Sequence, residues 1–527
     1  MPDTWDLRPD LVMGYFWVIL AFGAALRFFR LDAQSLWLDE GLQFFAANAE
    51  SLLETVERAK AWANPPLSYI ITHLFLLPRS SDFFFRLPST LFSIGSLPLL
   101  FLLAKSLISK QAAIFAVLIM AVSPLHVWFS QDGRMYSQLI FFCLLSTIFI
   151  WKAIEQGRWY WWALYAAAVV AGMGTQVFMG FAAFSHLAWL LLCHRRRLPA
   201  FGVALGAAAL PFLPWAGLFL HSFRVSAGKS DLLLGALPYT LFTYAAGFSF
   251  GPSIADLHEN RSIGIIQEFL PAILPATFIF GILLVAGLIA LQKSPRRESF
   301  FLCLFGLCVP LWGALIYSLS LRYNVRYTVA AFPYFCIIAG TALAFIFRRN
   351  TVLGIFFIAA VLTISASSLY NYFTDPRYAK EDVRSAVAFW KGRADNLRLL
   401  SNVKYPVIRY LAEEDSKRHF SIPYQFNEAS AIKDLFERHG LESAYVLLAR
   451  DWHGQMEKAV RESFNVGEEK TFPGVKVMRV HVAGHRSLAR SLKSQTNQGY
   501  RLKWQAWDMR LFTVGRGVWT VDYLDEI

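Results

Sequence analysis

The sequence predicts an α-helical polytopic membrane protein with a small water-soluble α/β domain at its C-terminal end. The chain has 527 residues, of which 56% are hydrophobic, and its mean hydropathy is +0.41, which is too apolar for a set of soluble domains. Apolar stretches of about 20 residues, the length that crosses a bilayer, recur as far as residue 370. Charged residues become much more frequent after that point. We therefore expect a transmembrane domain over residues 1–370 and an α/β domain over residues 371–527.

About eleven transmembrane helices are expected from the apolar stretches. The first is predicted to be an uncleaved signal anchor, because no cleavage site of small residues follows it. The expected spans are residues 11–30, 86–105, 111–129, 135–152, 160–178, 180–194, 199–221, 269–291, 299–319, 328–347 and 351–370.

Basic residues mark alternate loops between these spans. Clusters such as 195–197 and 348–349 fall on one side, which the positive-inside rule assigns to the cytoplasm together with the N-terminus. An odd number of spans then places residues 371–527 outside the cytoplasm. The net charge of +13 is explained by these short clusters, so no nucleic-acid partner is expected. All five cysteines lie in apolar runs, which argues against a disulfide scaffold or a cysteine metal site.

Three regions outside the cytoplasm are not simple loops. Residues 34–62 are amphipathic at helical spacing and predict one or two helices parallel to the membrane. Residues 231–251, interrupted by glycine and proline, predict an interfacial or re-entrant segment. In the C-terminal domain the patterns predict strands at 397–403 and 443–449, helices at 382–392 and 429–440, and edge strands or a surface flap at 501–524.

Two adjacent acids, Asp39 and Glu40, follow the first span. One interpretation is that Asp39 caps a helix that begins near Gly41, with Glu40 favoured by the positive helix end. The other is that a carboxylate at the boundary of water and lipid acts as a general base, since partial desolvation raises its pKa. The two interpretations are compatible.

Arginines and tyrosines occupy two further outer loops. Arg134 and Tyr136 follow Gln131 and Asp132, and they predict either interfacial anchors or a phosphate site. His126 in the same region is expected to be structural. Another loop holds Arg322, Arg326 and Tyr327 on the side where topology disfavours cations, and Arg86 lies at the same level. Together these arginines predict a lipid phosphate or pyrophosphate partner, with bulk anionic headgroups as the alternative.

Five motifs occur in an order that resembles a known family. They are Asp39-Glu40, NPPLSYI at 64–70, RLPS at 86–89, SPLHVWFSQDGRMYS at 123–137 and RY at 326–327. Over about residues 10–370 the chain resembles the polyprenol-phosphate-dependent glycosyltransferases of the GT-C class, in the branch similar to protein O-mannosyltransferases and the lipid A aminoarabinose transferase.

This resemblance implies the GT-C fold and an enzyme of the bacterial inner membrane that transfers a sugar, with inversion, from an undecaprenyl phosphate carrier to an acceptor outside the cytoplasm. Asp39 is then the general base or the residue that orients the acceptor, with Glu40 beside it. The residues expected around the donor phosphate are Arg86, Arg134, Tyr136, Arg326 and Tyr327. Many relatives have His where this chain has Asn64 and Glu-Ala where it has Asp132-Gly133, so substrate contacts of Asn64, Gln131 and Asp132 are left open.

Several alternatives stay open at this point. The acceptor is a glycan, lipid A, a protein or a cell-wall polymer, and the need for a divalent metal is undecided because no HxxxH motif or acidic cluster indicates a metal site. The main rival function is a transporter or flippase of lipid-linked sugars. Transporters place charged groups near the membrane midplane and contain inverted repeats, and neither feature is found in the sequence. A second rival is an inactive scaffold, which the intact Asp39-Glu40 pair disfavours.

Overall fold

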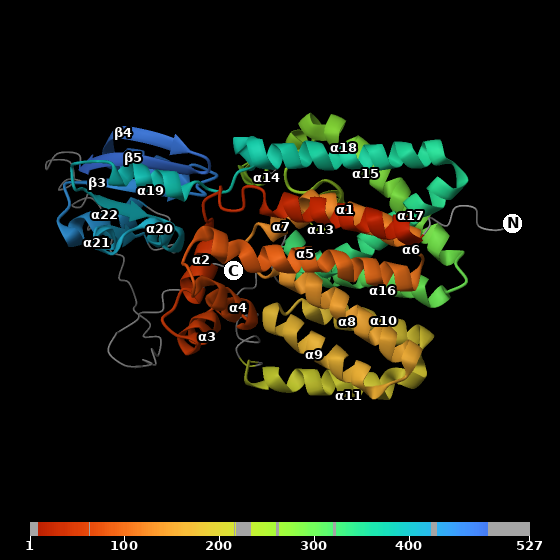
Figure 1. Ribbon diagram of the computed structural model, residues 1–527. Helices are drawn as coiled ribbons and strands as arrows, with labels where there is room; N and C mark the ends of the chain where they lie inside the picture. Colours follow the sequence, from red (N-terminus) through yellow and green to blue (C-terminus); the bar gives the residue numbers. More distant parts are fainter. Residues whose placement is uncertain are drawn as a thin grey trace. The chain divides into compact units, whose positions relative to one another are not determined.

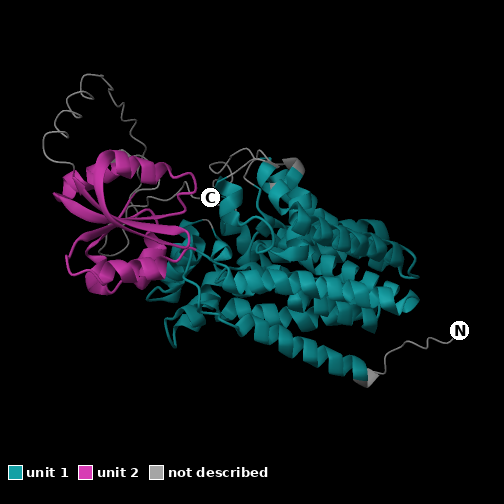
Figure 2. Ribbon diagram, turned by 90° about the horizontal axis from the view of Figure 1, so that it is seen from above, with its two compact units in different colours: residues 1–380 teal, residues 381–527 magenta. Residues whose placement is uncertain are grey.

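The computed structural model describes residues 9–62, 64–215, 217, 233–259, 263–319, 323–422 and 429–482. The chain divides into two compact units, residues 1–380 and 381–527 (Figure 2). The boundary expected after residue 370 falls inside helix α18 (Thr351–Thr374). The end of this helix, the turn η4 (Pro376–Tyr378) and the residues up to Lys380 therefore belong to the first unit.

The first unit is a bundle of apolar helices (Figure 1). Every stretch expected to span the membrane contains a helix. Eight helices in the described part of the chain are long and apolar enough to cross a membrane, or nine if a bent pair counts as one span, so the expected count of eleven is not confirmed. The bundle also includes shorter helices. Together with α18, the helices at the expected spans are α1 (Pro9–Phe28), α5 (Asp82–Leu107), α6 (Lys110–Val122), α7 (Pro124–Ser130), α8 (Tyr136–Gln156), α9 (Trp159–Thr175), α10 (Met179–Cys193), α11 (Leu198–Ala209, flanked by turns η1 Arg195–Arg197 and η2 Leu210–Phe212), α15 (Ile263–Gln292), α16 (Arg297–Tyr317) and α17 (Phe332–Arg349, preceded by η3 Val325–Ala331).

The bent pair consists of α6 and α7, which meet at an angle of 59°. Pro124 opens α7 because a proline lacks the N–H that would continue a helix from α6. Ser123 caps the new helix by accepting a hydrogen bond from the backbone N–H of His126. The bend therefore directs the chain into the loop that contains Asp132 and Arg134.

Helix α17 is the most buried span, since 89% of its apolar window lies inside the protein. Glycines let three neighbouring helices approach it closely. A Cβ atom on Gly340 would lie 2.5 Å from the backbone nitrogen of Ala116 in α6, and one on Gly287 of α15 would lie 2.1 Å from the carbonyl oxygen of Ile338. A Cβ atom on Gly306 of α16 would lie 2.4 Å from the ring of Tyr334. These contacts make α17 the centre of the bundle.

Short helices connect α1 to α5. They are α2 (Leu38–Ala47), α3 (Leu52–Ala61) and α4 (Leu67–Leu76), and Figure 1 shows them together at one end of the bundle. Residues 34–62 thus contain two helices, within the one or two that were predicted, and α4 follows as a third before α5; their orientation parallel to the membrane stays a prediction. In the second outer region the structure has α13 (Leu233–Ala246) and α14 (Ile254–Glu259), while residues 218–232 and 260–262 lie outside the described part.

The second unit contains a five-stranded mixed sheet in the order β2-β1-β3-β5-β4. Strand β1 (Arg398–Ser401) is parallel to β2 (His419–Ser421) and to β3 (Ser443–Ala449), whereas β5 (Val475–Val482) is antiparallel to β3 and β4 (Phe464–Phe472). Its helices are α19 (Val383–Lys391), α20 (Lys404–Tyr410), α21 (Glu413–Ser416), α22 (Ala429–His439) and α23 (Gln455–Ser463). The expected α/β domain is confirmed, while the predicted edge strands at 501–524 lie outside the described residues.

Candidate active site

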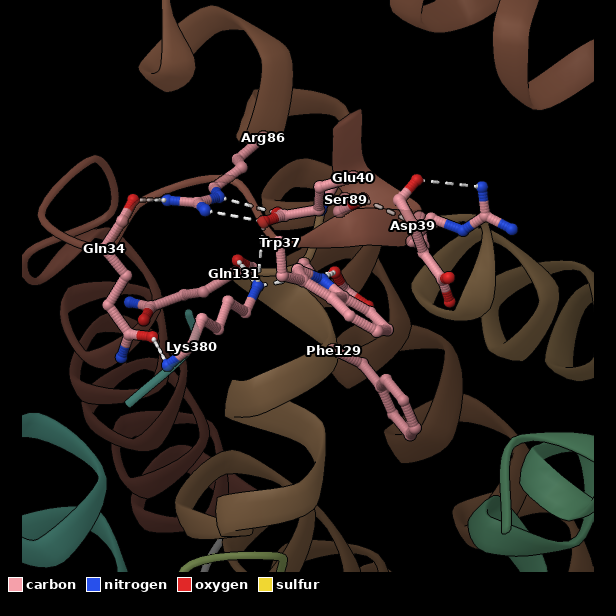
Figure 3. Close-up of polar contacts among 12 residues, drawn as sticks. Gln34, Trp37, Asp39, Glu40, Arg86, Ser89, Phe129, Gln131 and Lys380 are labelled. Atoms are coloured by element: carbon pink, nitrogen blue, oxygen red, sulfur yellow. Dashed lines mark hydrogen bonds and ion pairs between the residues drawn. The ribbon is translucent and has the colours of Figure 1, made fainter. Parts of the chain in front are cut away.

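Charged and aromatic side chains from distant segments of the first unit meet near the start of α2. The segments are the turn before α2 with its first residues, the outer end of α5, the loop between α7 and α8, the turn η3, and Lys380 at the end of the unit. Figure 3 shows Glu40 turned toward Arg86 and Lys380, while Asp39 lies on the side away from them. The site therefore has an inner and an outer group of charges.

Asp39 and Glu40 have different surroundings although they are neighbours in sequence. Helix α2 begins at Leu38, so both acids are in its first turn and their side chains point about 100° apart around the axis. The Glu40 side chain is completely buried, whereas that of Asp39 is 24% exposed. The predicted capping role of Asp39 is wrong, because the residue at the N-cap is Trp37, which makes no capping hydrogen bond with its side chain.

The inner group is centred on Glu40. Its carboxylate accepts hydrogen bonds from Arg86 Nε at 2.8 Å, Arg86 Nη2 at 2.7 Å and the backbone N–H of Gly133 at 2.8 Å, and Lys380 Nζ lies 3.2 Å away. Burial alone would raise the pKa of this carboxyl, but Arg86 and Lys380 together lower it to about 2. Glu40 is therefore a fixed anion inside the protein, and the structure gives it a structural role in place of the catalytic one expected from sequence.

Arg86 also directs its guanidinium group into the protein. In addition to Glu40, it donates to the backbone carbonyls of Leu31, Gln34 and Ser35 at 2.9–3.0 Å. The side chain is 1% exposed. An arginine has five N–H donors, and these contacts use all of them. The expectation that Arg86 binds the donor phosphate does not fit this geometry, and Arg86 instead holds the turn before α2 against α5.

Asp132 and Gln131 belong to the same interior network. Asp132 is 1% exposed and accepts a hydrogen bond from Trp37 Nε1 at 2.9 Å. Burial raises the pKa of its carboxyl, the nearby Glu40 carboxylate adds to this, and Lys380 opposes it. Gln131 donates to carbonyls of Arg27 and Phe29 at the end of α1 and accepts from the Tyr372 hydroxyl. The contacts of both side chains are thus with the protein, which disfavours the substrate contacts that sequence left open.

Lys380 completes the inner group and was not singled out from the sequence. Its ammonium group lies 3.4 Å from Asp132 Oδ1 and donates to the backbone carbonyl of Gln131 at 3.2 Å. Its backbone N–H donates to the side-chain oxygen of Gln34 at 3.1 Å. The side chain is only 2% exposed, which is exceptional for lysine.

Two members of the outer group, Asp39 and Arg326, are partly exposed. Arg326 Nη1 donates to Asp39 Oδ2 at 2.5 Å, and the two side chains are 22% and 24% exposed. The Arg326 guanidinium lies over the ring of Trp37 at 4.7 Å and that of Tyr136 at 5.7 Å. Arg134 Nη1 donates to the backbone carbonyl of Asp39 and to Gln43 Oε1, both at 3.3 Å. The structure therefore brings Asp39, Arg134, Tyr136 and Arg326 together as predicted.

Tyr69 is a further member of the site that residue-level reasoning missed. It lies on α4 within the NPPLSYI motif and is fully buried. Its phenol interacts with the guanidinium of Arg134, whose Nε is buried. Burial raises the pKa of the Tyr69 phenol, and the positive charge of Arg134 opposes this shift. The NPPLSYI motif was noted in the sequence as a whole, but nothing in it distinguished Tyr69 as a residue of the site.

The other predicted residues make different contacts or are not described. Tyr327 packs between the rings of Phe178, at 4.5 Å, and Tyr317, at 5.5 Å. Asn64 follows α3, where its backbone N–H donates to the carbonyl of Ala59, and its substrate contact stays a prediction. Arg322 lies outside the described residues. His126 is buried against Arg27, with Nδ1 at 2.7 Å from Nη2, which agrees with a structural role.

A metal site is not apparent in the part of the chain that the structure describes. No group of three or more His, Cys, Asp or Glu side chains there is arranged to hold a metal ion. The described site offers the partly exposed carboxylate of Asp39 beside two guanidinium groups, which suits binding of an anion next to a proton acceptor.

Comparisons with known proteins agree with the predicted resemblance. Residues 63–216 match the family described as dolichyl-phosphate-mannose-protein mannosyltransferase. A putative mannosyltransferase of Bacillus subtilis, YkcB, is 36% identical over 111 residues, which is 21% of this chain and 15% of that protein. The similarity thus covers only a small part of the length of that curated relative.

Solved structures show the same fold. ArnT from Cupriavidus metallidurans, bound to undecaprenyl phosphate, matches 89% of this chain and 98% of its own with a TM-score of 0.54 at 13% identity. The oligosaccharyltransferase AglB from Archaeoglobus fulgidus, in complex with an inhibitory peptide and a dolichol-phosphate, matches 90% of this chain and 74% of its own, with a TM-score of 0.53 at 11% identity. The chain is a multi-pass membrane protein with the GT-C fold, and its residues 63–216 are similar to glycosyltransferases of the mannosyltransferase family.

Proposed function

We propose that this protein is a glycosyltransferase that moves a sugar from a polyprenyl phosphate carrier, such as undecaprenyl phosphate, to an acceptor outside the cytoplasm. The family match and the similarity to structures that hold polyprenyl phosphates support a lipid-linked donor. The observation that carries the proposal is the outer group. It contains a partly exposed carboxylate, Asp39, in contact with Arg326 and next to Arg134.

In this proposal the carboxylate of Asp39 accepts the proton of the acceptor hydroxyl as its oxygen attacks the anomeric carbon of the sugar. The bond from that carbon to the phosphate oxygen breaks on the opposite face, so the configuration inverts. Negative charge grows on the leaving phosphate, where Arg134, Arg326 and the hydroxyl of Tyr136 stabilise it. The donor phosphate competes with Asp39 for Arg326, which frees the carboxylate for the acceptor.

The inner group supports this chemistry without taking part in it. Arg86 and Glu40 hold the first turn of α2, and the backbone N–H of Gly133 ties the loop of Arg134 to the same carboxylate. We further propose that the protein lies in the bacterial plasma membrane with its N-terminus in the cytoplasm and residues 381–527 outside. The alternation of basic loops supports this orientation.

Transfer of radiolabelled sugar tests the proposal. Purified protein in lipid nanodiscs is given a panel of polyprenyl-phosphate sugars and cell-envelope acceptors, and wild type is compared with Asp39→Asn. Loss of transfer with retained donor binding is expected, because the amide keeps the shape of the side chain but is a poor base. The matched control is Glu57→Gln on α3, a carboxylate that is 60% exposed and pairs only loosely with Lys60, and this variant should behave as wild type.

Two results would contradict the proposal. Equal transfer by wild type and Asp39→Asn would remove Asp39 from the chemical step. Binding of a donor by wild type without transfer from any donor would favour the flippase, and movement of the intact lipid-linked sugar across proteoliposomes would then establish that function.

A further inference from the structure

Lys380 carries a buried charge that the proposed chemistry does not use. It is the last residue of the first unit, where the chain leaves the bundle for the second. Its ammonium group nevertheless reaches the interior, with Glu40 Oε2 at 3.2 Å and Asp132 Oδ1 at 3.4 Å. A buried ammonium group costs several kcal/mol to desolvate, so this placement requires compensation by both acids.

Charge balance shows what Lys380 contributes. The inner group contains two carboxylates, Glu40 and Asp132, and two cations, Arg86 and Lys380. All four side chains are at most 2% exposed, so solvent does not screen them. Removal of Lys380 would leave two acids and one arginine in a low dielectric. The remaining pair, Arg86 and Glu40, is already matched, so the surplus negative charge would fall on Asp132.

Asp132 lies two residues before Arg134 of the outer group, in the same loop. Lys380 binds the backbone carbonyl of Gln131 and the side chain of Asp132, and the next backbone N–H, that of Gly133, binds Glu40. Arg134 comes next, and its carbonyl accepts a hydrogen bond from Ser89 at 2.9 Å. The four consecutive residues 131–134 are thus fixed to the inner group and to α5, and Lys380 supplies two of these attachments.

We propose that Lys380 is a positioning residue, which places the Arg134 guanidinium beside Asp39 by neutralising Asp132 and binding the backbone of the loop 131–134. This inference rests on the proposed function of the outer group as the donor phosphate site. It also makes the last residues of the first unit part of the active-site support. A displacement of about 1 Å at such a site lowers the rate about 10²-fold, which sets the scale of the effect.

The proposal predicts a pH dependence that simple loss of packing would not produce. Asp132 faces Lys380 and is also influenced by Glu40 of α2, Arg326 of η3 and the Trp37 side chain. Tyr372 of α18 interacts with the same carboxylates. Without Lys380, neutrality returns when Asp132 takes up a proton. The defect of Lys380→Met should therefore shrink as the pH falls.

The experiment compares Lys380→Met, Asp132→Asn and the double variant in nanodiscs, with Lys458→Met as the control because that lysine is 78% exposed in the second unit. The value of kcat/KM for the donor is measured relative to wild type between about pH 8 and about pH 5. Lys380→Met should lose about 10- to 100-fold at the higher pH, mainly through a raised donor KM, and should recover toward wild type at the lower pH. The double variant should be closer to wild type and should lack this pH dependence.

A defect of Lys380→Met that is equal at all pH values and persists in the double variant would overturn the proposal, as would an unchanged donor KM. Tryptophan fluorescence can be used to measure binding of undecaprenyl phosphate to the same variants, which gives the same comparison without turnover. If wild type binds this lipid but transfers no sugar, the proposed function fails. The pH-dependent loss of binding in Lys380→Met then still tests the positioning role.

Discussion

The buried ion pair between Glu40 and Arg86 allows a quantitative test of the inner group. The substitution Glu40→Gln keeps the shape of the side chain and removes its charge. Two cations, Arg86 and Lys380, then face Asp132 alone. Because the group is buried, the surplus positive charge has no solvent to stabilise it, so we expect a large loss of stability.

The contacts indicate the magnitude of the loss. Nitrogen atoms lie 2.7 Å and 3.2 Å from Glu40 Oε2, which corresponds to attractions of about 6 and about 5 kcal/mol at an effective dielectric constant of about 20. Desolvation cancels much of this, and removal of one partner of a buried pair costs about 3–5 kcal/mol. The lowered pKa of Glu40 in the folded protein agrees in direction with a stabilising ion pair.

A surface ion pair provides the control. Glu54 and Arg58 on α3 have the same nitrogen–oxygen distance of 2.7 Å, but their side chains are 39% and 23% exposed. For Glu54→Gln we expect a loss below about 1 kcal/mol. The free energy of unfolding is measured by SDS titration in mixed micelles for wild type and both variants. Losses of equal size in Glu40→Gln and Glu54→Gln would refute the argument that burial determines the strength of the pair.

The same variant yields a pH test with a definite sign. The pKa of Glu40 is lower in the folded protein than its usual 4.5, so its charge stabilises the fold fully above about pH 4.5. This contribution is lost as the pH falls toward about 2. The difference in stability between wild type and Glu40→Gln should therefore narrow over this range, and a constant difference would assign the effect to something other than the charge.

Three further variants test the surroundings of the site. Arg326→Lys keeps a positive charge but loses the planar group that lies over Trp37, and kcat/KM for transfer should fall about 10²-fold; unchanged transfer would exclude Arg326 from phosphate binding. Trp37→Phe removes the 2.9 Å hydrogen bond to Asp132 and should cost about 1–3 kcal/mol in SDS titration, whereas no loss would show that the bond is replaced. Gly133→Ala places a Cβ atom 2.0 Å from the ring of Phe85, so it should cost about 1–3 kcal/mol and weaken donor binding; normal donor binding would show that the loop adapts.

The apolar stretches located the helices of the bundle, because composition largely determines which segments enter a bilayer, although the count of eleven spans is not confirmed. The family resemblance grouped Asp39 with Arg134, Tyr136 and Arg326, which the structure brings together, but it also placed Arg86 at the phosphate. The sequence did not separate Asp39 from Glu40. Two adjacent acids in the first turn of a helix look alike in sequence, and only the packing of α5 determines which one meets Arg86.

Lys380 was beyond the reach of sequence reasoning for a different reason. It is separated from Asp132 by 248 positions, and an isolated lysine after a span normally indicates a solvated residue. The hairpin of β4 and β5, by contrast, had a usable signal. Pro473 and Gly474 join the strands, and Gly474 has φ of +61°, a conformation that glycine adopts easily.

The central position of α17 affects how the protein tolerates amino-acid changes. A helix that faces lipid accepts any apolar side chain, whatever its size, because lipid tails adapt to its shape. Helix α17 instead meets neighbouring helices closely at glycines. Whether a substitution at these contacts is tolerated therefore depends on the volume of the new side chain and not on its hydrophobicity. A saturation library should therefore reject even Gly340→Ala, while residues of α11, in a span whose apolar window is only 17% buried, exchange freely among leucine, phenylalanine and valine.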